Sequence, residues 1–235
     1  MTILPVHNHL TKPMSNERGV TLMEAMVYTA IAGMLLLTAV TAFLGQNKSY
    51  NRQDVIAEIQ QNVRGAAEIL GADIRFAGFD HKEHSIDPFV TATTGEIEIE
   101  YWTDLDDDGR YDDNVDPALD EITTVNYTLP GGTTNLMRTV NGAQSVIAEN
   151  IERFRLEYLL DDGSWAGNPT DLNQIRAVKI IFLGSARPAA FNPTDSSTYF
   201  PPVEGNPGEG PWTPLANTGY KRMVTIITQC RNCGS

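Results

Sequence analysis

The feature that most constrains this chain is a run of twenty residues without a charged side chain, residues 25–44 (AMVYTAIAGMLLLTAVTAFL). A helix rises roughly 1.5 Å per residue, so this run would be about 30 Å long, the thickness of a bilayer's hydrocarbon core. The run contains no proline, and Thr29, Thr38 and Thr41 can each bond back to the preceding helical turn. The run therefore predicts a membrane-spanning helix close to the N-terminus.

The charge of the chain is distributed unevenly around this run. The whole chain has a formal net charge of −13, whereas residues 1–19 contain Lys12 and Arg18 against Glu17. By the positive-inside rule, the short flank is expected in the cytoplasm and the acidic bulk of the chain outside it. A surface this acidic repels phosphate backbones, so the composition excludes nucleic acid as a partner.

The helix is expected to continue beyond the apolar run. Through residues 45–79, apolar residues recur at steps of four and three opposite a polar face, which is typical of an amphipathic helix. No proline occurs between Val20 and Asp87, so we expect one helix from about Val20 to about Phe76, roughly 85 Å long. The expected buried stripe consists of Val55, Ile59, Val63, Ala66, Leu70, Ile74 and Ala77.

Three interpretations of the N-terminus are open on these patterns. A secretory signal peptide would be cleaved after Ala42, where Val-Thr-Ala fits the small-residue rule, and a plain signal anchor would stay uncleaved. The third interpretation depends on residues 18–24, Arg-Gly-Val-Thr-Leu-Met-Glu, just before the apolar run. Glu24 is the informative residue, because a carboxylate near the start of a membrane helix costs a few kcal/mol and rarely stands there without a partner.

Residues 18–24 resemble the end of the leader in type IV prepilins, where a basic residue and a glycine precede the cleavage site. The resemblance implies that prepilin peptidase removes residues 1–19 after Gly19 and that Val20 becomes the N-methylated terminus. It also implies that Glu24 pairs with the charged amino terminus of a neighbouring subunit and sets axial register in the filament. Val20 departs from the family pattern, which more often has phenylalanine or methionine at this position.

The later elements resemble those of the PilW-type minor pilins and, more distantly, the J-type pseudopilins of type II secretion. The first resemblance implies a minor pilin that helps to initiate assembly of a type IV pilus and sits at or near its tip. The second implies, as the alternative, a pseudopilin at the tip of a type II secretion pseudopilus. Implied partners are the other minor pilins, the major pilin, prepilin peptidase and the inner-membrane assembly platform. The implied location is a single pass of residues 20–44 through the inner membrane, with the head outside. The segments that carry the resemblance are 69–79, 96–113, 151–158 and 175–182.

Beyond Phe79 the pattern predicts a head domain, residues 80–235, in which a mostly antiparallel sheet packs on the helix, an α+β fold. In residues 96–102, apolar and acidic side chains alternate as in a half-buried strand. Residues 185–219 hold seven of the thirteen prolines and predict a long surface loop, either a flexible connection or a partner contact. Strands are expected at 96–102, 122–129, 135–140, 152–160, 175–183 and 220–229, with glycine-containing turns at 130–132, 141–142 and 161–163.

An acidic segment between the first two expected strands matches the first half of an EF-hand calcium loop. Gly109 stands at position 6, but Val115 stands where a bidentate glutamate belongs, and Asp113, Asp116 or Asp120 would have to substitute. The pattern predicts a bound Ca²⁺, and the alternative is a solvated acidic turn. The expected ligands are Asp104, Asp106, Asp108, Asp112 and the backbone carbonyl of Arg110.

The only two cysteines, Cys230 and Cys233, form a C-x-x-C pair that ends a strand-like run. A redox motif or half of a zinc site has the same spacing, but outside the cytoplasm a short structural disulfide is the expected outcome. No motif for a nucleophile, a phosphate loop or paired catalytic carboxylates is evident, so the prediction is a non-enzymatic protein. An anchored or released calcium-dependent binding domain is the alternative of another class.

Overall fold

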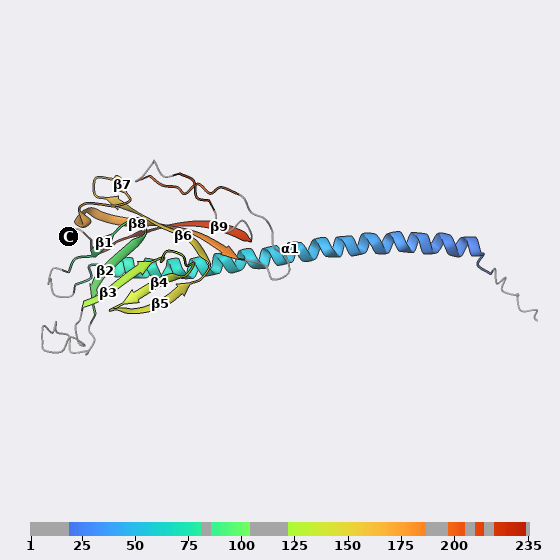
Figure 1. Cartoon of the computed structure of the whole chain (residues 1–235), viewed down its shortest axis with the longest axis horizontal. Coiled ribbons are helices and arrows are strands. Elements are labelled where there is room, and N and C mark those ends of the chain that lie inside the picture. Colours follow the sequence, from blue (N-terminus) through green and yellow to red (C-terminus); the bar gives the residue numbers. More distant parts are fainter. Residues whose placement is uncertain are drawn as a thin grey trace, which may run out of the picture. The chain divides into compact units, whose positions relative to one another are not determined.

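The computed structural model describes residues 19–80, 86–103, 122–186, 197–204, 210–213 and 219–233. The chain divides into two compact units, Met1–Ser49 and Tyr50–Ser235. One helix, α1 (Leu22–Phe76), contributes residues to both units (Figure 1). Its bounds agree with the expected helix to within two residues, because no proline interrupts the pattern before Gly78.

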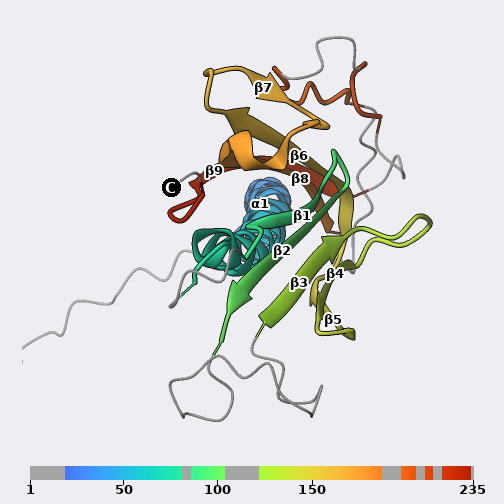
Figure 2. The ribbon, with the colours of Figure 1, turned by 90° about the vertical axis from the view of Figure 1, so that its left-hand side faces the viewer.

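The second unit is organised around the C-terminal half of α1. Figure 2 shows this half of the helix between two sheets. All seven residues of the expected stripe are buried, which confirms the amphipathic half of the helix. Val63, Ala66, Leu70, Ile74 and Ala77 are each 0% exposed and pack in one core with apolar residues of both sheets.

Gly78 ends α1 because the backbone there has a positive φ of 70°, which strains any residue with a side chain. A Cβ atom at this position would also lie 2.7 Å from Pro88 Cγ. The Gly78 N–H donates to the Glu100 carbonyl at 2.8 Å, so the end of the helix is fastened to the neighbouring sheet.

The first sheet has five antiparallel strands in sequence order, β1-β2-β3-β4-β5. Ile97 and Ile99 of β2 pair with Tyr127 and Val125 of β3, and all four side chains are buried toward the helix. Asn141 and Gly142, both with positive φ, form the expected tight turn between β4 and β5. The strands are β1 (Phe89–Ala92), β2 (Glu96–Trp102), β3 (Ile122–Thr128), β4 (Leu136–Val140) and β5 (Ala143–Ala148).

The second sheet has four antiparallel strands in the order β7-β6-β8-β9. Its central strand β8 pairs with β6 on one side and with β9 on the other, and a single 3₁₀ turn, η2 (Leu172–Gln174), precedes it. Gly184 of β8 lets α1 approach closely, since a Cβ there would lie 2.8 Å from Val63 Cγ2. The strands are β6 (Ile151–Leu160), β7 (Trp165–Ala166), β8 (Ile175–Ala186) and β9 (Tyr220–Gln229).

The α+β class and the antiparallel pairing are confirmed, but the strands form two sheets rather than the one sheet that was expected. All six expected strands exist, while β1, β5 and β7 were not predicted. Strands β1 and β7 have only four and two residues, too few for an alternation to be recognised. Strand β5 is an edge strand whose first four residues are exposed, so its sequence carries no buried face.

The described residues of the expected loop, 185–219, add two features that its composition did not predict. Strand β8 continues to Ala186, and Tyr199 and Trp212 form an isolated β-bridge. Trp212 is only 8% exposed and packs with Ile181 and Leu183 on the face of β8 that points away from α1. We call residues 197–204 and 210–213 the covering segment, because they bury the outer face of the four-stranded sheet.

Candidate functional site

The N-terminus of α1 is built by a threonine cap. Thr21 Oγ1 accepts a hydrogen bond from the Glu24 N–H at 3.2 Å, three residues along the chain. The Thr21 carbonyl accepts from the Ala25 N–H at 3.0 Å. The second bond is the first regular bond of the helix, and the first satisfies an N–H group that would otherwise lack a partner. A glutamate three residues after a threonine is also the spacing of a capping box. The helix therefore starts at Leu22, and Glu24 lies in its first turn.

The Glu24 side chain has a partner on its own helix. The Tyr28 hydroxyl, one turn further along, donates to Glu24 Oε1 at 2.7 Å, and both side chains are exposed. No other side-chain contact of Glu24 is found among the described residues. Sequence reasoning singled out Glu24 but missed Thr21 and Tyr28. The spacings of three and four residues from Glu24 were the signal that could have found them.

The apolar run is uncovered in the structure. Every residue from Ala25 to Leu44 is exposed, and large side chains such as Leu36 and Phe43 show 65% and 66% of their surface. Within the described part of the chain, α1 is the helix that is long and apolar enough to cross a membrane. Thr29, Thr38 and Thr41 donate to carbonyls three or four residues earlier, as predicted, so they add no unsatisfied hydroxyl to the helix surface.

The predicted cleavage position lies before the helix. Gly19 and Val20 have no regular secondary structure, both are exposed, and a Cβ atom at Gly19 would meet nothing within 4 Å. Cleavage after Gly19 and N-methylation of Val20 stay predictions. Residues 1–18, the rest of the predicted leader, lie outside the described residues.

A charged cluster joins α1 to the five-stranded sheet. Asp73 Oδ2 lies 2.8 Å from Arg138 Nη2 and also accepts from the Tyr127 hydroxyl. Burial, and then the Asp73 charge, raise the pKa of Tyr127 well above its usual value, so the phenol stays protonated and donates. Each of these three side chains therefore has a hydrogen-bond partner in the cluster. The cluster docks α1 on the five-stranded sheet.

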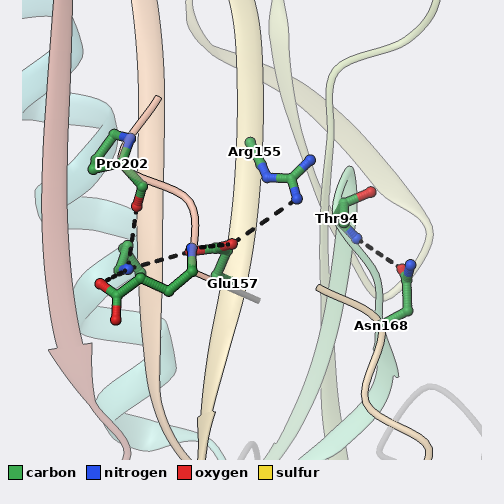
Figure 3. Close-up of polar contacts among 7 residues, drawn as sticks. Thr94, Arg155, Glu157, Asn168 and Pro202 are labelled. Carbon is green, nitrogen blue, oxygen red and sulfur yellow. Dashed lines mark hydrogen bonds and ion pairs between the residues drawn. The ribbon is translucent and has the colours of Figure 1, made fainter. Parts of the chain in front are cut away.

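A second buried polar network lies on the outer face of the four-stranded sheet (Figure 3). Lys179 Nζ donates to Glu157 Oε2 at 3.2 Å, to Glu204 Oε1 at 2.8 Å and to the Pro202 carbonyl at 3.2 Å. The ammonium group also lies 4.0 Å from the centre of the Trp165 ring, a cation–π contact. Because Glu157 and Lys179 are 0% and 3% exposed, the covering segment removes both charges from water.

Cys230 and Cys233 are joined by a disulfide with their Cα atoms 5.6 Å apart. The loop that they close contacts the end of α1, where Asn232 Nδ2 lies 3.3 Å from the carbonyl oxygens of both Arg75 and Ala77. These carbonyls belong to the last turn of the helix or follow it directly and lack helical partners. The disulfide loop thus contributes a C-terminal cap.

The predicted calcium ligands, Asp104, Asp106, Asp108, Asp112 and the Arg110 carbonyl, all lie outside the described residues. Among the residues that are described, no group of three or more His, Cys, Asp or Glu side chains could hold a metal ion. The calcium prediction therefore depends on the sequence pattern alone.

The described architecture is that of a type IV pilin-like fold: a long N-terminal helix whose apolar half is uncovered and whose other half packs on antiparallel sheets. Among solved structures, the chain is similar to a type IV-like pilin from Thermus thermophilus, with a TM-score of 0.50 and 14% sequence identity. The match covers 75% of this chain and 97% of that one. No protein-family model and no curated protein matches the sequence.

Proposed function

We propose that this chain is a minor pilin, a structural subunit that helps to initiate a type IV pilus and sits at or near its tip. The observation that carries the proposal is the uncovered apolar half of α1 with a carboxylate in its first turn. An apolar helix of this length is stable only in lipid or against other apolar helices. Before assembly the helix would lie in membrane lipid, and after assembly it would pack against the apolar helices of the filament core.

Glu24 favours the role in filament assembly over that of a plain membrane anchor. A carboxylate within the hydrocarbon costs about 3 kcal/mol, and the Tyr28 hydroxyl compensates for part of this cost. The charged amino group of a neighbouring subunit, freed by cleavage after Gly19, would supply the opposite charge. That ion pair would contribute most to the free energy of subunit association in a low-dielectric environment. It would also fix the axial position of the new subunit.

The proposed partners are other minor pilins, the major pilin, prepilin peptidase and the inner-membrane assembly platform. The proposed location is the inner membrane before assembly, with the acidic head outside the cytoplasm. The order of the strands, including the pair β6 and β8, supports assignment to the PilW-type branch.

The decisive experiment is N-terminal sequencing of the mature chain from cells with and without prepilin peptidase. A methylated Val20 terminus only in the presence of the peptidase is the expected result. A terminus at Phe43 would mean a cleaved secretory signal, and retention of Met1 in both strains would mean a plain anchor. Either result would overturn the assembly role.

The role of Glu24 can then be separated from membrane insertion. Glu24→Gln keeps the size of the side chain and its hydrogen-bonding ability but removes the charge. We expect normal amounts of processed protein in the membrane and a pilus number reduced at least about tenfold, since the ion pair that places this subunit in the initiating complex is lost. Tyr28→Phe is the matched control, because it removes the contact within the helix but keeps the charge. Wild-type piliation with Glu24→Gln would contradict the register role.

A further inference from the structure

The four-stranded sheet ends at β9, a long edge strand beside α1 (Figure 2). Strand β9 has ten residues and pairs with β8 along its whole length without a register shift. The other edges among the described strands are β1, β5 and β7. Strand β7 has only two residues, and the pairings of β1 and β5 are each interrupted by an irregularity. In the described part of the chain, β9 is therefore the one edge that is both long and regular.

The unpaired side of β9 presents a row of backbone groups. The Cys230 N–H donates to the Arg176 carbonyl at 3.0 Å, in the register that also pairs Gln229 with Ala177. Opposite residues in an antiparallel pair alternate between hydrogen-bonded and non-bonded pairs. The even-numbered residues of β9 therefore bond to β8, and the N–H and C=O groups of the odd-numbered residues point away from it. Within the described residues, no hydrogen bond to these outward groups is found for Met223, Thr225, Ile227 and Gln229.

This part of β9 lacks the features that protect an edge. Natural sheets block their edges with a proline, a bulge, charged side chains or a covering segment. Residues 223–229 (MVTIITQ) contain no proline and no charged side chain. Thr225, Ile227 and Gln229 are all exposed, and Ile227 shows 57% of its surface. An open edge of this kind is a template for one more strand from another chain.

The side chains of β9 define two faces that an added strand would extend. Met223 packs with the cluster around Trp212 on the outer face of the sheet, so the odd-numbered side chains lie there. Val224 and Ile226 pack against the core that includes α1, so the even-numbered side chains lie on the inner face. The exposed Ile227 side chain therefore leaves apolar surface on the outer face, next to the open edge.

The inner face of β9 has an arginine near each end. Arg222 is exposed on this face, close to the start of the strand. Near the other end, Arg75 Nη1 and Thr228 Oγ1 lie 3.5 Å and 3.0 Å from the position of a Cβ on Gly71, so Arg75 is a neighbour of β9. Neither arginine forms an ion pair with another described residue. In a chain with a net charge of −13, this local positive charge favours an acidic partner.

The direction of β9 excludes a symmetric pair of anchored copies. Strand β9 runs along α1 in the same direction, because Arg52 lies 5.6 Å from the centre of the Tyr220 ring and Thr228 lies close to Gly71. Two identical edge strands pair symmetrically only when they are antiparallel, and the helices packed on them would then also run in opposite directions. Subunits anchored in one membrane by the same N-terminal run have helices that point the same way.

We propose that β9 binds an extended, acidic segment of a different pilin subunit, which becomes the fifth strand of this sheet. Backbone hydrogen bonds would supply affinity, and alternate side chains would supply specificity. Acidic side chains of the added strand would face Arg222 and Arg75, and apolar ones would cover Ile227. The choice of a pilin as the partner rests on the proposed function, whereas the strand-binding edge does not.

The test is a titration of the full-length chain in zwitterionic detergent with a fluorescent, capped peptide of alternating valine and glutamate. Binding is measured by fluorescence anisotropy, and the same peptide with lysine for glutamate is the matched control. We expect the glutamate peptide to bind at least about tenfold more tightly than the lysine peptide, and this difference to shrink when salt is added. Equal binding of both peptides would overturn the acidic partner, and no binding at roughly 1 mM would overturn the site.

Backbone pairing has its own signature in the peptide. Only every second N–H of an added strand points to β9. N-methylation of one alternate set of peptide nitrogens should therefore abolish binding, and N-methylation of the other set should leave most of it. Equal affinities of the two methylated peptides would refute strand addition.

Variants locate the binding on β9. Thr225→Pro removes an outward N–H that β8 does not use, and proline is tolerated at such edge positions. It should weaken peptide binding about tenfold or more, through the lost hydrogen bond and the proline ring. Ile227→Lys should also weaken it, while Gln144→Lys on the edge strand β5 is the control and should bind as the wild type does. The melting temperature without peptide reports folding, and if Thr225→Pro does not fold, Ile227→Lys decides. Wild-type affinity in both folded β9 variants would contradict the proposal.

The partner is identified in cells. A photoreactive amino acid in place of Gln229 should cross-link this chain to a different pilin subunit. Cross-links only between two copies of this chain would overturn the choice of partner. If the peptide binds but the mature chain is not cleaved after Gly19, the proposed function fails and the strand-binding edge stands.

Discussion

Asp73 of α1 and Arg138 of β4 form an ion pair in which Oδ2 and Nη2 are 2.8 Å apart. The side chains are 11% and 24% exposed, so the pair is largely shielded from water. The contact lies near the C-terminal end of the helix and joins it to the fourth strand of the five-stranded sheet. A charged residue on the buried side of an amphipathic helix is therefore a docking contact in this protein.

Asp73→Ala should destabilise the chain by about 3 kcal/mol, because Arg138 is left partly buried without its counter-charge. The double variant Asp73→Ala/Arg138→Met should lose less than the sum of the two single variants, since no unpaired charge remains. The measurement is the free energy of unfolding in urea for the four proteins of the cycle. Additive effects would show that the two residues act independently.

Two glycine-to-alanine substitutions should have effects of opposite sign. A Cβ at Gly184 would lie 2.8 Å from Val63 Cγ2 and 2.9 Å from Ile59 Cγ2, so Gly184→Ala should destabilise by about 1–3 kcal/mol. At Gly65, on the exposed side of the same helix, a Cβ meets nothing within 4 Å. Gly65→Ala should stabilise by up to about 1 kcal/mol through helix propensity. Thermal unfolding of both variants measures the difference, and a stable Gly184→Ala would contradict the close helix–sheet approach.

Lys179→Met should destabilise by about 3–5 kcal/mol and loosen the covering segment, because the buried Glu157 carboxylate would lose the ammonium group that donates to it at 3.2 Å. Limited proteolysis should then cut within residues 197–213 faster than in the wild type. The control is the double variant Glu157→Gln/Lys179→Met, in which both charges of the Glu157–Lys179 pair are removed together and stability should partly recover. Unchanged proteolysis in Lys179→Met would show that the covering segment is held by Trp212 and its apolar contacts alone.

If the acidic segment binds calcium, a chelator should lower the melting temperature of the chain and added Ca²⁺ should restore it. A ligand that binds only the folded state stabilises it by about 2.7 kcal/mol at a concentration one hundred times its dissociation constant. Asp106→Asn/Asp108→Asn should abolish the effect, while Asp161→Asn, in a turn remote in sequence, should not. A wild-type melting curve that is the same in chelator and in Ca²⁺ would mean that the segment is a solvated turn.

Patterns with a short period were sufficient to predict α1, its buried stripe and six of the nine strands in the described part of the chain. In each case the side chains that share a face are two, three or four residues apart, so their common burial is visible in the local sequence. The same reasoning missed Tyr28 as the partner of Glu24, although its spacing of four residues lay within reach. The division into two sheets was not predictable in this way, because alternation identifies a strand without identifying its neighbours.

The sequence alone determined that an apolar helix begins near Gly19, that it carries Glu24 in its first turn and that it continues into an amphipathic half. These are properties of neighbouring residues on one helix. Only the tertiary structure decided that Arg155, Glu157 and Lys179 are buried, since alternating charged residues on a strand are equally typical of a face exposed to solvent. Their cover comes from the segment around Glu204, 25 residues after Lys179, and long-range packing of this kind leaves no periodic signal in the sequence.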